Sequence, residues 1–411
     1  MIKIRRVTIL TGVLLLTVIA QSVLAADFSI ACRQIANLSR WPAVYKELGL
    51  APDSSWQLQS LNRLIFSERK AGYRFKFEAE LAASHYSSEK VAGRSNWQTD
   101  RRKTGFKAFK TDARLLDRSR SQIVSEIERC EISFSSGKFD FQIGRQPISF
   151  GTSHYISVMD VLAPFQPGYL DSSYKPGIDA IRVRTISGTT GELELIFAAA
   201  ADAHDNAVFA RLRDTFGGFD LEVLAGRFRE RKFFGAGWEG EKRKINLWGE
   251  IALFERLNQF DRHLGGFSND YALSWIAGFE KDTGNDWRHG IAFLHQDFGA
   301  RDVDTLAVAG STLPYLQGWT HLSASQYVIV NSNRELNPLT HLNMNAMISL
   351  VDKSALLQPV LNISTSDESD LSVFCWIKAG PGLARAGGQV VAGSEFGSFP
   401  VGIGAIFRRY F

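Results

Sequence analysis

The sequence has 411 residues, among them 29 Phe, 10 Tyr, 9 Trp and 35 Gly, a composition that disfavours a disordered or collagen-like chain. The formal net charge is +4, but without Lys3, Arg5 and Arg6 of an amino-terminal export signal the chain has 44 basic against 43 acidic residues, which removes a basic case for nucleic-acid binding. Beyond residue 25, apolar runs such as residues 195–201 are far shorter than the roughly 18 to 20 residues of a membrane-spanning helix, so a polytopic helical membrane protein is excluded.

The first 25 residues have the three parts of a secretory signal peptide. The basic segment precedes an apolar stretch over residues 7–19, and a small-residue cleavage site ends at Ala25. Thirteen apolar residues form a helix of about 20 Å, short of the roughly 30 Å hydrocarbon core, which disfavours an uncleaved anchor. We therefore expect export through the Sec pathway and cleavage near Ala25.

From about residue 56 onward, the hydrophobic pattern has a period of two residues, which indicates strands. Residues 73–81 place Tyr, Phe, Phe, Ala and Leu on one face and Arg, Lys and Glu on the other, and residues 271–279 repeat the pattern. About sixteen such segments are separated by Gly, Asp, Asn and Ser clusters. Most are longer than the five or six residues that are usual for soluble strands.

Long alternating strands in an exported chain favour a closed, antiparallel transmembrane β-barrel, since an open sheet edge would leave backbone groups unsatisfied in lipid. Short and long connections alternate, as with periplasmic turns and extracellular loops. The short ones are 135–138, 187–191, 215–218, 282–286 and 366–370, and the long ones are 87–112, 151–177, 256–270, 298–318 and 380–395. We expect about 16 strands if residues 56–66 lie outside the barrel, and 18 if another strand precedes them. Residues 26–55 are expected to form a periplasmic segment or a short plug, and residues 56–411 the barrel.

The last alternating segment carries a family resemblance. Phe399, Val401, Ile403, Ala405 and Phe407 share one face, and Phe411 follows. An amphipathic strand with a terminal Phe resembles the signal that the outer-membrane barrel assembly machinery recognises. The resemblance implies a Gram-negative outer-membrane barrel with that machinery as a partner.

A second resemblance lies in residues 144–151, Gly-Arg-Gln-Pro-Ile-Ser-Phe-Gly, with residues 160–167. This stretch is similar to segments of porins grouped around alginate-export and phosphate-selective channels, in which such a strand leads into a long loop. The resemblance implies passage of solutes across the outer membrane. The loop over residues 151–177 is rich in proline and either folds inward to narrow the pore or lies on the surface. Its constriction candidates are Asp160, Asp171, Lys175 and Asp179.

Strand parity also assigns charged residues to the lumen. Across two expected hairpins, Arg184 comes opposite Glu192, Arg182 opposite Glu194, Arg213 opposite Asp220 and Arg211 opposite Glu222. These pore-lining candidates either form a ring that selects a charged or sugar-like solute, or pair off as wettable wall residues. We favour the second interpretation, because pairing cancels much of the field. Arg145 shares parity with Phe141 and Ile143, so unless a bulge intervenes it points toward lipid and snorkels.

No catalytic or metal-binding spacing is visible, so the sequence predicts neither an enzyme nor a cofactor. An outer-membrane hydrolase would rest on Ser153, His154 or Ser268, none of which has a convincing partner in the sequence.

These observations together predict a porin-like channel in the cell outer membrane for small hydrophilic or charged solutes, anionic ones included, or for a polymer. The alternative is a plugged structural or adhesin-like barrel that transports nothing. Expected partners are outer-membrane lipids, the transported solute, and two further copies in a homotrimer.

Overall fold

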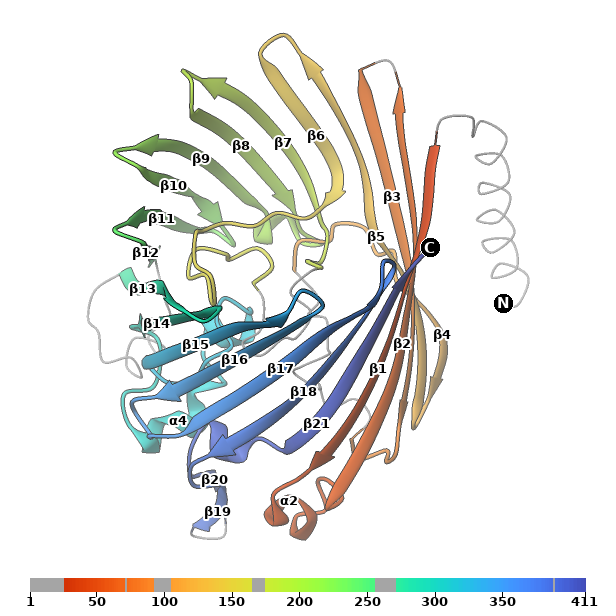
Figure 1. The fold of residues 1–411 in the computed structure, drawn as a ribbon, viewed down its shortest axis with the longest axis vertical. Coiled ribbons are helices and arrows are strands. Elements are labelled where there is room, and N and C mark those ends of the chain that lie inside the picture. The colour runs from red at the N-terminus through yellow and green to blue at the C-terminus, as the bar shows by residue number, and fades with distance from the viewer. Residues whose placement is uncertain (1–25, 71, 92–104, 165–173, 256–270, 387–388) are drawn as a thin grey trace.

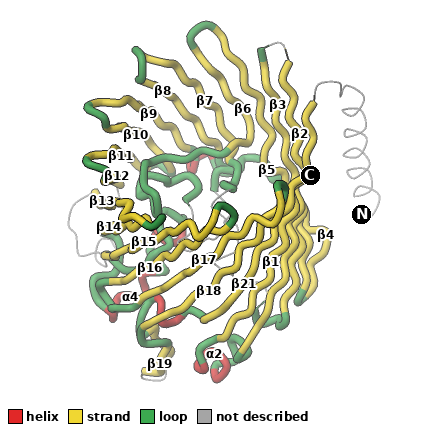
Figure 2. Tube along the Cα trace, viewed as in Figure 1, coloured by secondary structure: helices red, strands yellow, loops and turns green. Residues whose placement is uncertain are grey.

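The computed structural model describes residues 26–70, 72–91, 105–164, 174–255, 271–386 and 389–411. Nearly all of the regular structure in these residues is strand (Figures 1 and 2). The strands are β1 (Ala26–Arg40), β2 (Ser54–Lys70), β3 (Tyr73–Tyr86), β4 (Ala113–Arg118), β5 (Ser121–Ser136), β6 (Phe139–Gln146), β7 (Ile178–Ser187), β8 (Gly191–Ala199), β9 (Ala207–Phe216), β10 (Phe219–Phe228), β11 (Arg231–Lys242), β12 (Ile245–Glu255), β13 (Tyr271–Gly284), β14 (Trp287–Gln296), β15 (Gln326–Asn337), β16 (Thr340–Ser349), β17 (Ala355–Ser366), β18 (Ser369–Ala379), β19 (Leu383–Ala386), β20 (Gln389–Ala392) and β21 (Val401–Tyr410).

The helices are short and lie in connections: α2 (Ala43–Glu47), α4 (Val303–Ala309), α5 (Leu313–Leu316) and the 3-10 turns η1 (Ala203–Asp205) and η2 (Phe396–Ser398). Within the described residues, no helix is long and apolar enough to cross a membrane.

Eighteen of the described strands form one closed antiparallel barrel. Consecutive strands pair around the ring, and the ring closes because β1 pairs with β2 on one side and with β21 on the other. Two sets of strands lie outside the ring: β4 pairs only with β5, and β19 with β20 form a separate hairpin. Closure pairs the backbone all round the wall, which is the condition for a sheet in hydrocarbon.

The apolar face of the alternating strands is the outer one, as the sequence predicts. Ile181, Leu195 and Phe407 are exposed, whereas polar residues of the opposite parity, such as Glu194 and Arg211, are buried in the interior. This arrangement, apolar outside and polar inside, is that of an outer-membrane barrel.

The expected periplasmic segment or plug over residues 26–55 is wrong for residues 26–40, which form the barrel strand β1. The barrel therefore has 18 strands, the alternative that the sequence left open, instead of 16. The alternation of β1 is hard to recognise in the sequence, because at one point a polar residue faces outward and the next, apolar residue faces inward. Gln34 faces outward and donates a hydrogen bond of 2.8 Å to Ser60 Oγ, while Ile35 is buried inside.

The two ends of the barrel differ, as the connection lengths predicted. One end has turns of two or three residues, such as residues 217–218 and 285–286. Asn285 and Asp286 have φ of +50° and +62°, the backbone of a tight hairpin turn that suits the twist of the strands. The opposite end has the long loops, together with the two-residue β10–β11 turn, residues 229–230, and two of the long loops pack into the barrel.

Candidate pore and inward loop

The described part of the long loop after β6, residues 147–164, lies inside the barrel (Figure 2). We call it the inward loop. Its backbone and side chains contact acidic side chains that project into the lumen from β10, β12 and β13. Gly151 N donates to Glu222 Oε1 at 3.1 Å, and the Tyr155 hydroxyl donates to Glu280 Oε1 at 2.7 Å. Of the two placements considered for this loop, the structure shows the inward one.

Glu250 on β12 is the main anchor of the inward loop. Its side chain is fully buried, and one oxygen, Oε1, accepts hydrogen bonds from Thr152 N at 2.7 Å and Ser153 N at 2.5 Å. The other, Oε2, accepts from Ser157 Oγ at 2.8 Å, Val158 N at 2.9 Å and Met159 N at 3.3 Å. A buried carboxylate is tolerated only when such donors replace its water, so the loop and Glu250 stabilise each other.

Gly151 is required for this anchoring. Its φ is +94°, and a Cβ at this position would lie 2.3 Å from Glu250 Oε1 and 2.4 Å from Ser157 Oγ. A side chain would therefore meet both backbone strain and the anchoring carboxylate.

His154 forms a second anchor between two carboxylates. Its Nε2 lies 2.7 Å from Glu239 Oε1, and its Nδ1 lies 3.2 Å from Glu280 Oε1. The hydrogen bond to Glu280, followed by that to Glu239, raises the pKa of His154 to about 9. The imidazole is therefore positively charged at neutral pH and holds the loop between β11 and β13.

We expect this anchor to weaken in alkali. A raised histidine pKa means that the stabilisation is fully present below the ordinary value of about 6.5 and is lost as the pH rises through about 9. At about 1.4 kcal/mol per pKa unit, the shift from 6.5 to about 9 has an upper bound of about 3 kcal/mol. Water in the lumen screens the charges, so we expect about one pKa unit of this stabilisation, which is a tenfold change in the equilibrium of loop release. Current fluctuations from loop movement should therefore increase about tenfold between pH 7 and pH 10 in single-channel recordings.

The His154→Gln variant tests the assignment, since its side chain stays neutral. It should show large fluctuations already at pH 7 and no step near pH 9, whereas His204→Gln, at the exposed β8–β9 connection, should behave like the parent. An unchanged step in His154→Gln would show that another group titrates.

Of the four constriction candidates, the structure brings two together. Asp160 and Lys175 form a buried ion pair, and Lys175 Nζ also donates to Ser149 Oγ at 3.0 Å, so they tie the inward loop to its return. Asp179 belongs to β7, which starts at Ile178, and not to the loop. Asp171 lies outside the described residues.

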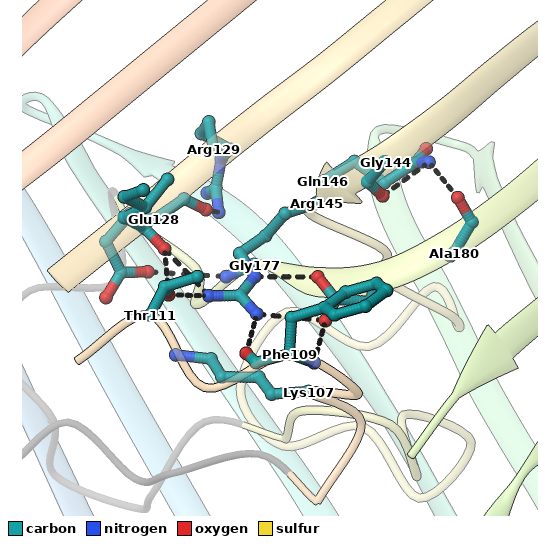
Figure 3. A network of polar contacts seen from close by, with 12 residues as sticks. Lys107, Phe109, Thr111, Glu128, Arg129, Gly144, Arg145, Gln146, Gly177 and Ala180 are labelled. Atoms are coloured by element: carbon teal, nitrogen blue, oxygen red, sulfur yellow. Dashed lines mark hydrogen bonds and ion pairs between the residues drawn. The ribbon is translucent and has the colours of Figure 1, made fainter. Parts of the chain in front are cut away.

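Asp179 instead binds Arg145, for which the lipid-facing expectation is wrong. The irregular backbone at Gly144, with φ of +117°, breaks the alternation before Arg145, and the guanidinium is buried under residues 105–111. Its Nε and Nη2 contact the two oxygens of Asp179 at 2.7 and 2.9 Å. Its remaining donors reach Phe109 O at 2.6 Å, Ile127 O at 3.0 Å and Thr111 Oγ1 (Figure 3).

This network seals a step in the barrel wall. β6 ends at Gln146, where the chain turns inward, but β5 continues beyond that point and pairs with β4. Residues 105–112 bridge the step: Asp179 N donates to Phe106 O at 2.9 Å, and Thr111 Oγ1 donates to Ile127 O at 3.3 Å. Arg145 thus has a structural role that its parity did not reveal.

Seven of the eight predicted pore-lining charges form ion pairs, and Asp220 is the exception. Glu194 contacts both Arg182, at 2.5 Å, and Arg211, and Arg213 lies 2.9 Å from Glu222. Arg184 lies 3.6 Å from Glu192 and 3.4 Å from Asp140.

The expected strand register was wrong in detail. Arg184 faces Glu194 across the β7–β8 hairpin, so the Arg182–Glu194 and Arg184–Glu192 contacts are diagonal. The β9–β10 turn has only Gly217 and Gly218, which puts Arg213 opposite Glu222, and Arg211 pairs with Glu194 across β8–β9. Asp220 accepts a hydrogen bond of 2.6 Å from Thr215 instead of an ion pair. In both hairpins the centre of the turn lies one residue later in the chain than expected, which moves every cross-strand partner by two residues.

A second long connection, residues 297–325, also packs into the lumen. Trp319 stacks on Phe254 with ring centroids 5.4 Å apart, and Gln296 Nε2 donates to Leu322 O at 3.0 Å. Glu395, from the connection before β21, accepts from Ser323 N at 2.8 Å and joins the two segments.

Between the inward loop and strands β13 to β17 an open cavity of about 670 Å³ remains. One side carries loop residues such as His154 and Tyr155, and the other side carries several lumen-facing amides. These amides were not among the predicted site residues, although Asn recurs at every second position in residues 331–333 and 343–345.

The closed barrel with a polar lumen and an inward loop defines the class of the protein as an outer-membrane-type β-barrel. No protein-family model and no curated protein matches the chain. Among solved structures it is similar to Acinetobacter baumannii OccAB2, with a TM-score of 0.57, 9% identity, and coverage of 94% of this chain and 98% of that one. It is also similar to Pseudomonas aeruginosa OccK5 (OpdH), with a TM-score of 0.54, 6% identity and coverage of 94% and 98%. At these identities the similarity concerns the fold, so the chain has the fold of these two proteins, a closed antiparallel β-barrel.

Proposed function

We propose that the protein is an outer-membrane channel for small hydrophilic or charged solutes. The observation that carries this proposal is the polar cavity left open beside the inward loop, within a wall whose outer face is apolar. A plugged barrel would have this space filled by side chains. Purified protein in a planar lipid bilayer should give stable conductance steps, and a silent bilayer would favour the structural or adhesin-like alternative.

The pairing of lumen charges supports weak ion selectivity. Arg182, Arg211 and Arg213 each contact a carboxylate, so little net field is left to discriminate anions from cations. In a tenfold KCl gradient we expect a reversal potential near zero.

Removal of Glu194 should change that selectivity. Glu194→Gln takes one carboxylate from between Arg182 and Arg211, so the reversal potential should move toward the anion side by about 10 to 20 mV in the same gradient. The Glu241→Gln variant, exposed at the β11–β12 turn, removes the same charge away from these arginines and should shift it less. Strong selectivity in the unmodified channel would show that Arg182, Arg184, Arg211 and Arg213 act as a ring.

We infer no catalytic role for this barrel. His154 is engaged by Glu239 and Glu280, and the Ser153 amide donates to Glu250, so both residues serve to hold the inward loop. Ser268 lies outside the described residues.

Export and assembly complete the proposal. The basic and apolar segments before Ala25 support Sec-dependent export with cleavage there, which amino-terminal sequencing of the membrane-bound protein tests. The outward Ile403 and Phe407 of β21 support recognition of this strand by the barrel assembly machinery. Association of three copies is tested by the mass of the detergent-solubilised protein.

A further inference from the structure

The cavity beside the inward loop has a patch of side-chain amides on its strand side. We call this patch the amide wall. It consists of Asn331 and Asn333 on β15, Asn343 and Asn345 on β16, and Gln358 and Asn362 on β17.

The amides lie in rows across neighbouring strands. Asn345 is the cross-strand partner of both Asn331 and Gln358, and Asn333 is the partner of Asn343. Asn333 Nδ2 donates to Asn331 Oδ1 at 2.6 Å, and Asn331 in turn donates to Asn345 Oδ1. Each amide has two donors and an oxygen that accepts two bonds. Two bonds among Asn331, Asn333 and Asn345 therefore leave both donors and acceptors for a molecule in the cavity.

The charged groups that line the same cavity are already engaged by neighbours. Asp160 is paired with Lys175, and Glu280 receives both His154 and the Tyr155 hydroxyl. No Lys or Arg is among the described residues of the cavity lining. An anion in the cavity would thus meet no cation with an open position, and a cation would meet carboxylates that are already engaged.

We propose that the amide wall binds neutral polyhydroxylated solutes, that is, uncharged sugars or polyols, on their way through the channel. This inference rests on the proposed channel function and specifies its substrate class. Hydroxyl groups both donate and accept, so they match an amide row, and no charge has to be desolvated on either side. The cavity volume of about 670 Å³ lies within the range of about 300 to 1,000 Å³ that is usual for small-molecule sites.

Saturation-transfer NMR on the detergent-solubilised protein tests binding independently of conductance. The probes are glucose, glucuronate, which differs from glucose by a carboxylate, and triethylene glycol, a polyether of similar size with few hydroxyls. We expect glucose to bind with a millimolar dissociation constant, at least as tightly as glucuronate and about tenfold more tightly than the polyether. Tighter binding of glucuronate, or equal binding of all three probes, would overturn the proposal.

The double variant Asn331→Leu/Asn345→Leu removes the centre of the amide row at nearly constant side-chain size. It should raise the dissociation constant for glucose about tenfold. Asn37→Leu on β1 is the matched control, because Asn37 is a buried lumen-side amide that does not line the cavity. The dissociation constant for glucose should be unchanged in this variant. Heat-modifiable migration on gels shows that each variant is folded. Equal glucose binding by the folded double variant would contradict the proposal.

Bilayer recordings separate this inference from the proposed function. In conducting channels, glucose should increase the current noise in the parent and in Asn37→Leu. The double variant should need about a tenfold higher glucose concentration for the same increase. Conductance without a glucose effect overturns the sugar site and leaves the channel intact. Glucose binding by NMR with a silent bilayer supports the site and contradicts the channel.

Discussion

Replacing Glu250 by Ala should raise the single-channel conductance about twofold, because the substitution releases the inward loop from the barrel wall. The substitution leaves the backbone N–H groups of Thr152, Ser153 and Val158 without their acceptor, and Met159 N with only Ser157 Oγ. A buried donor without a partner costs about 1 to 3 kcal/mol, so the loop regains its hydrogen bonds only by moving into the water of the lumen. Conduction then follows the larger open cross-section.

Single-channel recording in KCl measures this effect, and Glu241→Ala provides the control, since Glu241 is exposed on β11 and does not contact the loop. The control should keep the parent conductance. If Glu250→Ala also kept it, the remaining contacts of His154 and Tyr155 would be sufficient to hold the loop.

The second large effect is expected for stability. Arg145→Lys keeps the charge but replaces five donors in a fixed plane by three on a flexible stem. The bidentate contact with Asp179 and the bonds to Phe109 O and Ile127 O cannot all form, so we expect a loss of about 3 kcal/mol in the free energy of unfolding. Urea unfolding in detergent, followed by tryptophan fluorescence, measures it.

Arg184→Lys is the matched control, because Arg184 makes longer ion pairs and its side chain is 45% exposed. Its effect should stay below about 0.5 kcal/mol. Equal losses in the two variants would mean that the step at the end of β6 does not depend on the geometry of Arg145.

Period-two alternation predicted the barrel because each strand meets two different media. Where one side chain departed from that rule, the prediction failed. Gln34 faces outward beside Ser60, which hid β1 and gave the lower strand number. Connection lengths correctly separated the turn end of the barrel from the loop end, since the length of a connection can be counted in the sequence without knowing which way its side chains face.

The candidate site was predictable only in part. Opposite charges in consecutive strands predicted a paired lumen, but the two-residue turn at Gly217 and Gly218 shifted the partners. The anchoring of the inward loop by Glu250 joins residues about 90 positions apart, which no local pattern reports. The amide wall is visible in the sequence as alternate Asn residues, but its proposed role depends on the cavity that the inward loop leaves in front of it.

Closure through the β1–β21 pair also bears on how such proteins diverge. The wall is held by main-chain groups, which every amino acid except proline supplies in full, so a position is constrained mainly by whether it faces oil or water. Most substitutions that keep apolar residues on the lipid side and polar residues on the lumen side leave the barrel intact. A chain can therefore share its architecture with OccK5 over 94% of its length while only 6% of the residues coincide.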